Sequence, residues 1–265
     1  MVEAMIVGTD LVTVVTADVI RSRDARDIVA ALPAKLASVA HPLLVTPFSV
    51  SRGDELQAVC RGPLQAPEIV RQLRYACLPL RLRIGIGVGE IEPNPGGPGP
   101  DINEHASGSV HTNAPGHRQG VSPSGLTDAS GVPDPGARVH APALSSWEMN
   151  GSAFRRAREA LESLGKGTAP RTAVRSGDPC FDEAVGALLA LMDAIQGRWT
   201  PAQWDAIHHY ERLGTYGAAG KALGIALQNV QKRCKAASWS AVSQAEQALR
   251  RLAELWWGDA SPLRG

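Results

Sequence analysis

The stretch "FSVSRGDELQAVC", Phe48–Cys60, is the part of the sequence that decides the fold. Apolar and polar residues alternate along it, break at Gly53 and then alternate again, which predicts two half-buried strands joined as a hairpin. Two adjacent carboxylates, Asp54 and Glu55, stand at the predicted tip. A plain turn needs at most one Asp or Asn. The second acid raises the question of whether the tip is only a turn or holds a metal ion.

Regular segments flank this hairpin on both sides. A β-branched run over 12–19 predicts a buried strand, and apolar residues at three- and four-residue spacing predict helices over 25–40 and 67–78. The segment 82–91, "LRIGIGVGEI", predicts another strand and carries glycine at alternate positions. The order strand, helix, strand, strand, helix, strand is the βαββαβ pattern of a ferredoxin-like or palm domain. We therefore expect an α+β fold in which the end of the first strand lies beside the hairpin tip.

The composition changes after residue 92. The segment 93–144 is rich in Pro, Gly and Ser and nearly free of large apolar residues, so we expect a flexible insertion that buries little surface. Residues 1–92 and 145–178 are then the two parts of one palm-like domain, which a helix in "NGSAFRRAREAL" and a short strand complete. The long apolar helix that follows opens an all-helical domain, which we expect over 179–265.

Composition sets limits on the class of protein. With 44% hydrophobic residues, the 265-residue chain can build a core. Its formal net charge of +1 requires any nucleic-acid surface to come from local charge. The four cysteines form no C-x-x-C pair, which argues against a zinc knuckle or a thioredoxin-like motif. Without a leader or an apolar run long enough to span a bilayer, we expect a cytoplasmic protein with no membrane partner.

The first candidate site combines Asp18, at the end of the first strand, with the hairpin acids. Sites for Mg²⁺ often supply one or two carboxylates, while water and substrate phosphates complete the coordination shell. We therefore expect Mg²⁺ or Mn²⁺ as cofactor and a nucleoside triphosphate as ligand. Alternatively, Gly53-Asp54 is a plain turn and Asp18 caps a helix. The residues assigned to the nucleotide lie near the acids, at a helix start or on the later arginine-rich helix: Arg21, Ser22, Gly53, Glu55, Arg155 and Arg158.

The motifs around these acids resemble a known catalytic core. The segments "TADVI" (16–20), "SRGDEL" (51–56) and "RIGIGVGEI" (83–91) are, in this order, similar to the palm-type core of class III nucleotidyl cyclases and GGDEF diguanylate cyclases. With "NGSAFRRAREAL" (150–161) and a C-terminal helix-turn-helix, the chain resembles more specifically the bacterial SatD family. The resemblance covers most of the chain apart from the insertion, and the order of the motifs carries it.

The resemblance implies roles for individual residues. Asp18 and Asp54 match the metal-binding acids, and the carbonyl of Val19 matches a backbone ligand of the metal. Arg52 departs from the pattern, because it stands where GGDEF has its first glycine and where close approach of a guanine ribose requires one. The resemblance therefore implies nucleotide and metal binding but argues against synthesis of a diguanylate product.

The second candidate site is the stretch "GTYGAAGKALGIALQNVQKRCKAASW". Residues 216–223 predict a short helix, Gly224 a tight turn and 226–236 a second helix, which is helix-turn-helix spacing. Residues 212–245 contain five basic residues and no acid, a local charge that favours DNA. Alternatively, the helix pair only packs or dimerises. The predicted DNA-binding residues are outward-facing amides for base edges and basic residues for phosphates: Lys221, Gln228, Asn229, Lys232, Arg233 and Lys235.

The two sites together predict a nucleotide-responsive regulator of transcription that binds duplex DNA. One alternative is an active metal-dependent nucleotidyl transferase or cyclase, whose helical domain recruits nucleic acid or a partner. Another is a catalytically inactive adaptor. A single helix pair makes few contacts with DNA, so tight specific binding would require a homodimer on a repeated half-site.

Overall fold

The computed structural model describes residues 11–50, 54–64, 67–92, 146–165 and 169–258. The insertion expected at 93–144 lies outside these residues, as do Arg52 and Gly53 at the hairpin tip. In the described part of the chain, strands and helices succeed one another in the order that the sequence predicts up to residue 89, and helices predominate after residue 176.

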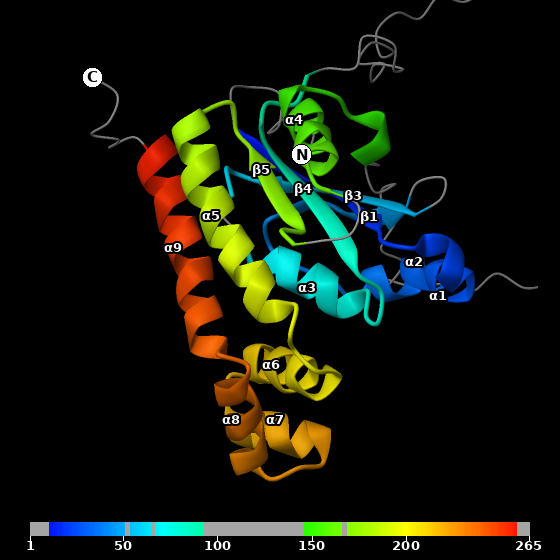
Figure 1. Ribbon diagram of the computed structural model, residues 1–265, viewed down its shortest axis with the longest axis vertical. Coiled ribbons are helices and arrows are strands. Elements are labelled where there is room, and N and C mark those ends of the chain that lie inside the picture. The colour runs from blue at the N-terminus through cyan, green and yellow to red at the C-terminus, as the bar shows by residue number, and fades with distance from the viewer. Residues whose placement is uncertain (1–10, 51–53, 65–66, 93–145, 166–168, 259–265) are drawn as a thin grey trace, which may run out of the picture. The chain divides into compact units, whose positions relative to one another are not determined.

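Within the described residues, five strands form one mixed sheet, part of which is seen in Figure 1. They are β1 (Val12–Val19), β2 (Leu44–Val50), β3 (Glu55–Arg61), β4 (Leu82–Gly89) and β5 (Thr172–Arg175). Their order is β2-β3-β1-β4-β5. The central strand β1 is antiparallel to both of its neighbours, β2 is antiparallel to β3, and β5 is parallel to β4. The strands and their helices confirm the expected α+β class.

The helices fall into two groups. The sheet region, which we define as β1–β5 and the helices among them, includes α3 (Glu68–Ala76) and α4 (Ser152–Glu162). The helical region, which we define as α5–α9, comes after β5. Its helices are α5 (Pro179–Gln196), α6 (Pro201–Leu213), α7 (Tyr216–Leu223), α8 (Leu227–Ala236) and α9 (Trp239–Trp257).

The single helix expected over 25–40 is wrong. This segment instead forms a 3-10 helix and two helices of five residues each, η2 (Ser22–Ala25), α1 (Arg26–Ala30) and α2 (Leu32–Leu36). Pro33 explains the break, because proline has no backbone N–H to donate and its ring clashes with the carbonyl four residues earlier. The same residue suits the first turn of α2, where it stands.

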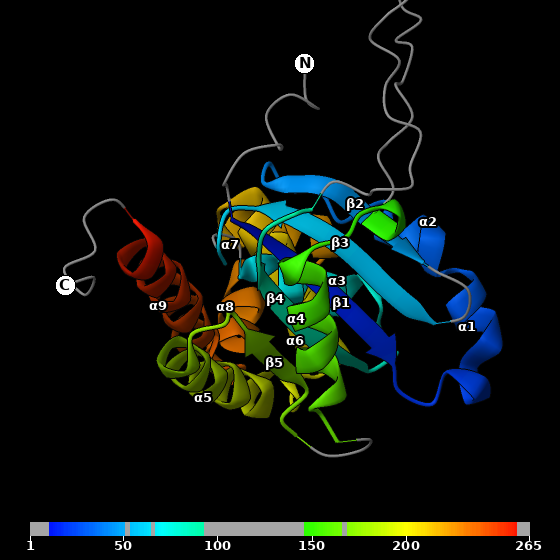
Figure 2. The same ribbon diagram turned by 90° about the horizontal axis from the view of Figure 1, so that it is seen from above.

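Alternate residues of the sheet face two different cores. Val15 and Ala17 of β1 belong to a large cluster that includes Leu73 of α3. Val14, which precedes them, belongs to a smaller cluster with Ala157 of α4. The two helices therefore cover opposite faces of the sheet, as the strand period of two requires. Seen from above, α4 lies over β4 and β1 (Figure 2).

Glycines of β4 allow α4 to lie directly on the sheet. A Cβ at Gly87 would stand 2.0 Å from the carbonyl oxygen of Ala153, and a Cβ at Gly85 would stand 2.2 Å from that of Ala157. No side chain tolerates such distances, so the close approach requires glycine at both positions. The alternating glycines over 82–91 therefore form the surface on which α4 packs, which we call the glycine seat.

The helical region shares its core with the sheet region. One continuous cluster of buried residues extends from β1 and α3 to Trp199, Trp204 and Trp239. In the same region α5 and α9 run side by side (Figure 1). The domain boundary expected at residue 179 coincides with the start of α5, but the core continues across it.

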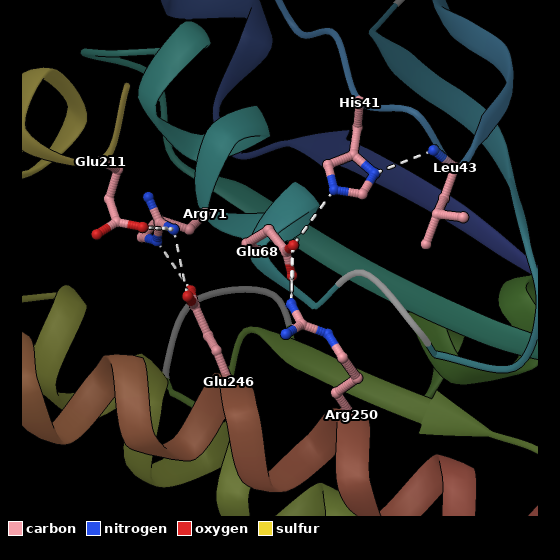
Figure 3. A network of polar contacts seen from close by, with 7 residues as sticks. All are labelled: His41, Leu43, Glu68, Arg71, Glu211, Glu246 and Arg250. Carbon is pink, nitrogen blue, oxygen red and sulfur yellow. Dashed lines mark hydrogen bonds and ion pairs between the residues drawn. The ribbon is translucent and has the colours of Figure 1, made fainter. Parts of the chain in front are cut away.

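A buried arginine joins α3 to α9 (Figure 3). Arg71 donates two hydrogen bonds to Glu246, from Nε at 2.8 Å and from Nη2 at 3.2 Å. Its guanidinium carbon lies 4.6 Å from the ring centroid of Trp239, and Glu211 of α6 lies 3.6 Å from Nη2. Burial raises the pKa of the Glu246 carboxyl, and Arg71 opposes that change. Because a buried carboxylate is costly without a partner, this pair fixes α9 on α3.

A second polar link lies beside the first (Figure 3). Glu68, one turn before Arg71 in α3, accepts hydrogen bonds from Arg250 of α9 at 2.9 Å. The Nε2 atom of His41 lies 3.3 Å from the same carboxylate, and Nδ1 of His41 accepts from the backbone amide of Leu43 at 3.2 Å. The two links together tie the start of β2, α3 and α9 into one network.

The seat of α4 can be tested with Gly87→Ala. We expect this change to lower the free energy of unfolding by about 1–3 kcal/mol, because the new methyl group meets the backbone of α4 rather than a flexible side chain. Gly186→Ala in α5 is the control: a Cβ there meets nothing within 4 Å, and the change should be neutral or stabilise by up to about 1 kcal/mol. Urea unfolding followed by circular dichroism measures both, and equal stabilities would contradict the close seat.

Candidate functional site

Three charged side chains lie side by side on neighbouring strands, on the face of the sheet that α4 covers. Strand pairing places Glu55 of β3 and Arg83 of β4 directly beside Asp18 of β1. Asp18 shares a face with Val14, because residues four apart in a strand point the same way. The end of the first strand therefore lies beside the hairpin, as the sequence predicts.

Both acids of this row have an arginine partner. Asp18 accepts a hydrogen bond from Arg83. Glu55 accepts one from Arg158 of α4 at 2.7 Å and a longer one from the hydroxyl of Thr16 at 3.4 Å. Such charge-assisted hydrogen bonds orient the carboxylates and reduce the negative charge that they present to a cation.

These side chains line a pocket of about 530 Å³ at the C-terminal end of α4, which we call the acidic pocket. The described residues of its lining carry more negative than positive charge, which attracts cations and repels a free polyphosphate, so a nucleotide would be favoured as its metal complex. Among the described residues, the charged ones of the lining are four carboxylates and two guanidiniums: Asp18, Asp54, Glu55, Glu162, Arg83 and Arg158.

The donor set of the acidic pocket fits a metal ion in part. No three His, Cys, Asp or Glu residues form a metal-binding group within the described ranges. Asp18 and Glu55 each bond an arginine, whereas Asp54 has no hydrogen bond or ion pair with another described residue. Asp54, Glu162 and the second oxygens of Asp18 and Glu55 therefore remain as possible ligands, and any two of them would make the kind of site that Mg²⁺ completes with water and phosphates.

Three residues assigned to the nucleotide lie outside the acidic pocket. Arg155 is exposed and pairs with Glu92 at 2.9 Å. Arg21 is exposed, and Ser22 begins the four-residue 3-10 helix η2 in place of the expected long helix. The binding of phosphate at this shorter helix start stays a prediction. The side chain of Val19 is in the core, and the role of its carbonyl stays a prediction.

Sequence reasoning missed Arg83 as a residue of this site. A signal was present, since Arg83 is the one charged residue of "LRIGIGVG" and shares the face of the alternating glycines. A charged side chain on that face must lie beyond the glycines that contact α4, or it must form a hydrogen bond or ion pair. Its partner Asp18 could be named only once the register of β1 and β4 was known.

Glycines also set the geometry of the second candidate site. Gly224 has a φ of 65°, and the amide of Ile225 donates to the carbonyl of Gly220 at 2.9 Å, as in a Schellman motif. A Cβ at Gly220 would stand 2.7 Å from the carbonyl oxygen of Ile225. Only glycine lets α7 approach the turn so closely. The two predicted helices and the glycine turn between them are confirmed.

Helix α8 has one buried and one exposed face. Val230 and Cys234 are buried. Gln228, Lys232 and Lys235 succeed one another at spacings of four and three, so they lie on one side of the helix. The structure places the six predicted DNA-binding residues in one helix pair, with Arg233 half-buried and five exposed: Lys221 of α7, and Gln228, Asn229, Lys232 and Lys235 of α8.

Comparison with known proteins assigns no family. No family model matches the chain, and no curated protein matches it. The resemblance to the SatD family and to nucleotidyl cyclases therefore stays a prediction from the motifs. In the part of the chain that the structure describes, no helix is long and apolar enough to cross a bilayer. Inferences about function accordingly depend on the acidic pocket and on α8.

Proposed function

We propose that the protein binds duplex DNA through α8 and acts as a regulator of transcription. The observation that carries this proposal is the α7–α8 pair, in which a glycine turn anchors one face of α8 and leaves its polar face exposed. Helix α6 contacts both members of the pair, which supports them from behind. A single exposed helix of ten residues fits the major groove of B-DNA, about 12 Å wide.

The side chains of the exposed face suit this role. Gln228 and Asn229 lie in the first turn of α8, where a recognition helix touches base edges, and their amides can pair with adenine. Lys232 and Lys235 lie further along and suit phosphates. The surrounding stretch 212–245 adds basic residues and no acid, so nothing in it repels the DNA backbone.

Replacing both exposed lysines, Lys232→Ala with Lys235→Ala, should weaken binding to all duplexes alike. We expect the slope of log K against log salt to flatten by about one to two, because up to two phosphate contacts are lost. Asn229→Ala should instead relax base preference at one position, by about 1–3 kcal/mol, and leave the slope unchanged. Fluorescence anisotropy over a salt series, with a duplex enriched from a random library, measures both.

Arg61→Ala with Arg251→Ala is the matched control. These arginines are exposed but lie in β3 and α9, outside the α6–α8 unit, so the variant should keep the parent's affinity and slope. If no sequence is enriched and the double lysine variant keeps the parent's slope, α7 and α8 only pack, and the adaptor alternative stands.

A second candidate function is binding of a nucleoside triphosphate with Mg²⁺ or Mn²⁺ in the acidic pocket. The favouring observation is that Asp18 and Asp54, from a strand end and a hairpin tip, line one pocket. The strand order β2-β3-β1-β4 supports it, because it fits the antiparallel sheet of a ferredoxin-like palm domain. Asp18, Asp54 and the Val19 carbonyl would hold the metal, and Arg158 would orient phosphates. The metal would neutralise phosphate charge, in a regulator or in a nucleotidyl transferase.

The acidic pocket can be tested with Asp54→Asn. We expect this variant to fold normally, because Asp54 is only partly buried, and to lose metal-dependent nucleotide binding. Asp27→Asn, an exposed acid in α1, is the control and should bind like the parent. Calorimetry with each triphosphate and Mg²⁺ or Mn²⁺ measures binding, and chromatography of the mixture shows any conversion. Equal binding by all three proteins would contradict the assignment.

A further inference from the structure

A second pocket, separate from the acidic pocket, lies where the sheet region meets the helical region. Its volume is about 270 Å³, and its lining comes from the segment between α3 and β4, the residue before β5, and the junction of α5 with α6. Of the described residues, three arginines line it, Arg74, Arg81 and Arg171, against one acid, Asp193. We call it the arginine pocket.

The opposite charges of Arg74 and Asp193 neutralise each other. Arg74 donates to the carboxylate of Asp193, to the side-chain carbonyl of Gln196 at 2.6 Å and to the hydroxyl of Thr172 at 2.5 Å. Asp193 also accepts from that hydroxyl at 3.1 Å and from the backbone amide of Arg171 at 2.7 Å. This network uses the one acid of the pocket and cancels one of its three positive charges.

The charges of the other two arginines are compensated less: Arg81 is exposed to solvent, and Asp193 offsets the charge of Arg171 only in part. Neither the guanidinium of Arg81 nor that of Arg171 forms a hydrogen bond or ion pair with another described residue. Burial lowers the pKa of Arg171, the like charges of Arg81 and Arg74 lower it further, and the negative charge of Asp193 opposes this change. Two guanidiniums at one cavity repel each other, and an anion between them would replace this repulsion by two attractions.

The remaining walls limit the size and the character of a ligand. Apolar side chains line much of the cavity, among them Leu78, Leu80, Trp199 and Trp204. The volume lies just below the range of roughly 300–1,000 Å³ typical of small-molecule sites. A pocket of this size holds a single phosphate group with a small organic part, and the apolar walls suit that part.

We propose that the arginine pocket binds a small molecule bearing one phosphate group, held by Arg81 and Arg171. A phosphate dianion matches these two guanidiniums in charge, and the planar fork of arginine suits its oxygens. Inorganic phosphate offers the same charge without the apolar contact. Because the walls come from both regions, the bound molecule touches both and stabilises their packing.

The test is calorimetry in EDTA, which excludes metal-dependent binding in the acidic pocket. The probes are inorganic phosphate, ribose 5-phosphate and adenosine monophosphate, with ribose as the uncharged reference. The parent should bind at least one phosphate compound saturably, with a rise in Tm. Arg81→Gln and Arg171→Gln should each weaken that affinity about tenfold or more, the effect of losing a charge-assisted hydrogen bond.

Two control variants separate this site from other effects. Arg251→Gln removes an exposed arginine of α9 and should leave affinity unchanged, as should Asp54→Asn in the acidic pocket. The side chains of Arg81 and Arg171 make no hydrogen bond with another described residue, so both variants should keep the parent's Tm without ligand.

The outcomes identify the source of the phosphate or overturn the proposal. Tighter binding of an organic phosphate than of inorganic phosphate indicates a phosphorylated small molecule, and equal affinities indicate phosphate itself. The proposal is wrong if no phosphate compound binds saturably or if both arginine variants bind like the parent. It is also wrong if a dicarboxylate such as malonate binds more tightly than every phosphate compound.

Discussion

The buried guanidinium of Arg71 is the contact on which the placement of the helices against the sheet depends. It lies in the core between α3 and α9 and satisfies the carboxylate of Glu246, which would otherwise be buried without a partner. Through Trp239 and Glu211 it also contacts the start of α9 and the end of α6. The helices that present α8 are therefore fixed to the sheet by a charged group, in addition to the apolar core that both regions share.

Close backbone contacts at glycine residues position the helices that carry the proposed sites. The glycines of β4 let α4 lie on the sheet, and its C-terminal end then stands beside Asp18 and carries Arg158 into the acidic pocket. Gly220 lets α7 lie close against the turn that leads into α8. The arginine pocket has walls from both regions. A ligand there would change the stability of the unit that carries α8, and a link between ligand and DNA binding would require no large movement.

Local patterns predicted the features that depend on local sequence. The period-two segments gave strands at the expected positions, and the glycine between two short helices marked the α7–α8 turn. The neighbourhood of Asp18 and the hairpin acids could be inferred from the βαββαβ order alone. The helix expected over 25–40 failed because Pro33 outweighed its apolar spacing. The contact between Arg71 and Glu246 spans 175 positions, and no local pattern reports which buried charges will meet. The arginine partners of Asp18 and Glu55 were missed for the same reason.

A double-mutant cycle on Arg71 and Glu246 tests most directly whether sheet and helices form one unit. Arg71→Met should lower the free energy of unfolding by about 3 kcal/mol or more, because it leaves the carboxylate of Glu246 buried without its partner. Glu246→Leu should lower it less, because Arg71 keeps its ion pair with Glu211. The double variant should lose less than the sum, with a coupling of about 1–3 kcal/mol, and each protein should unfold in a single transition by circular dichroism and tryptophan fluorescence. Additive losses, or a separate transition for the helices, would show that α5–α9 are held on the sheet in some other way.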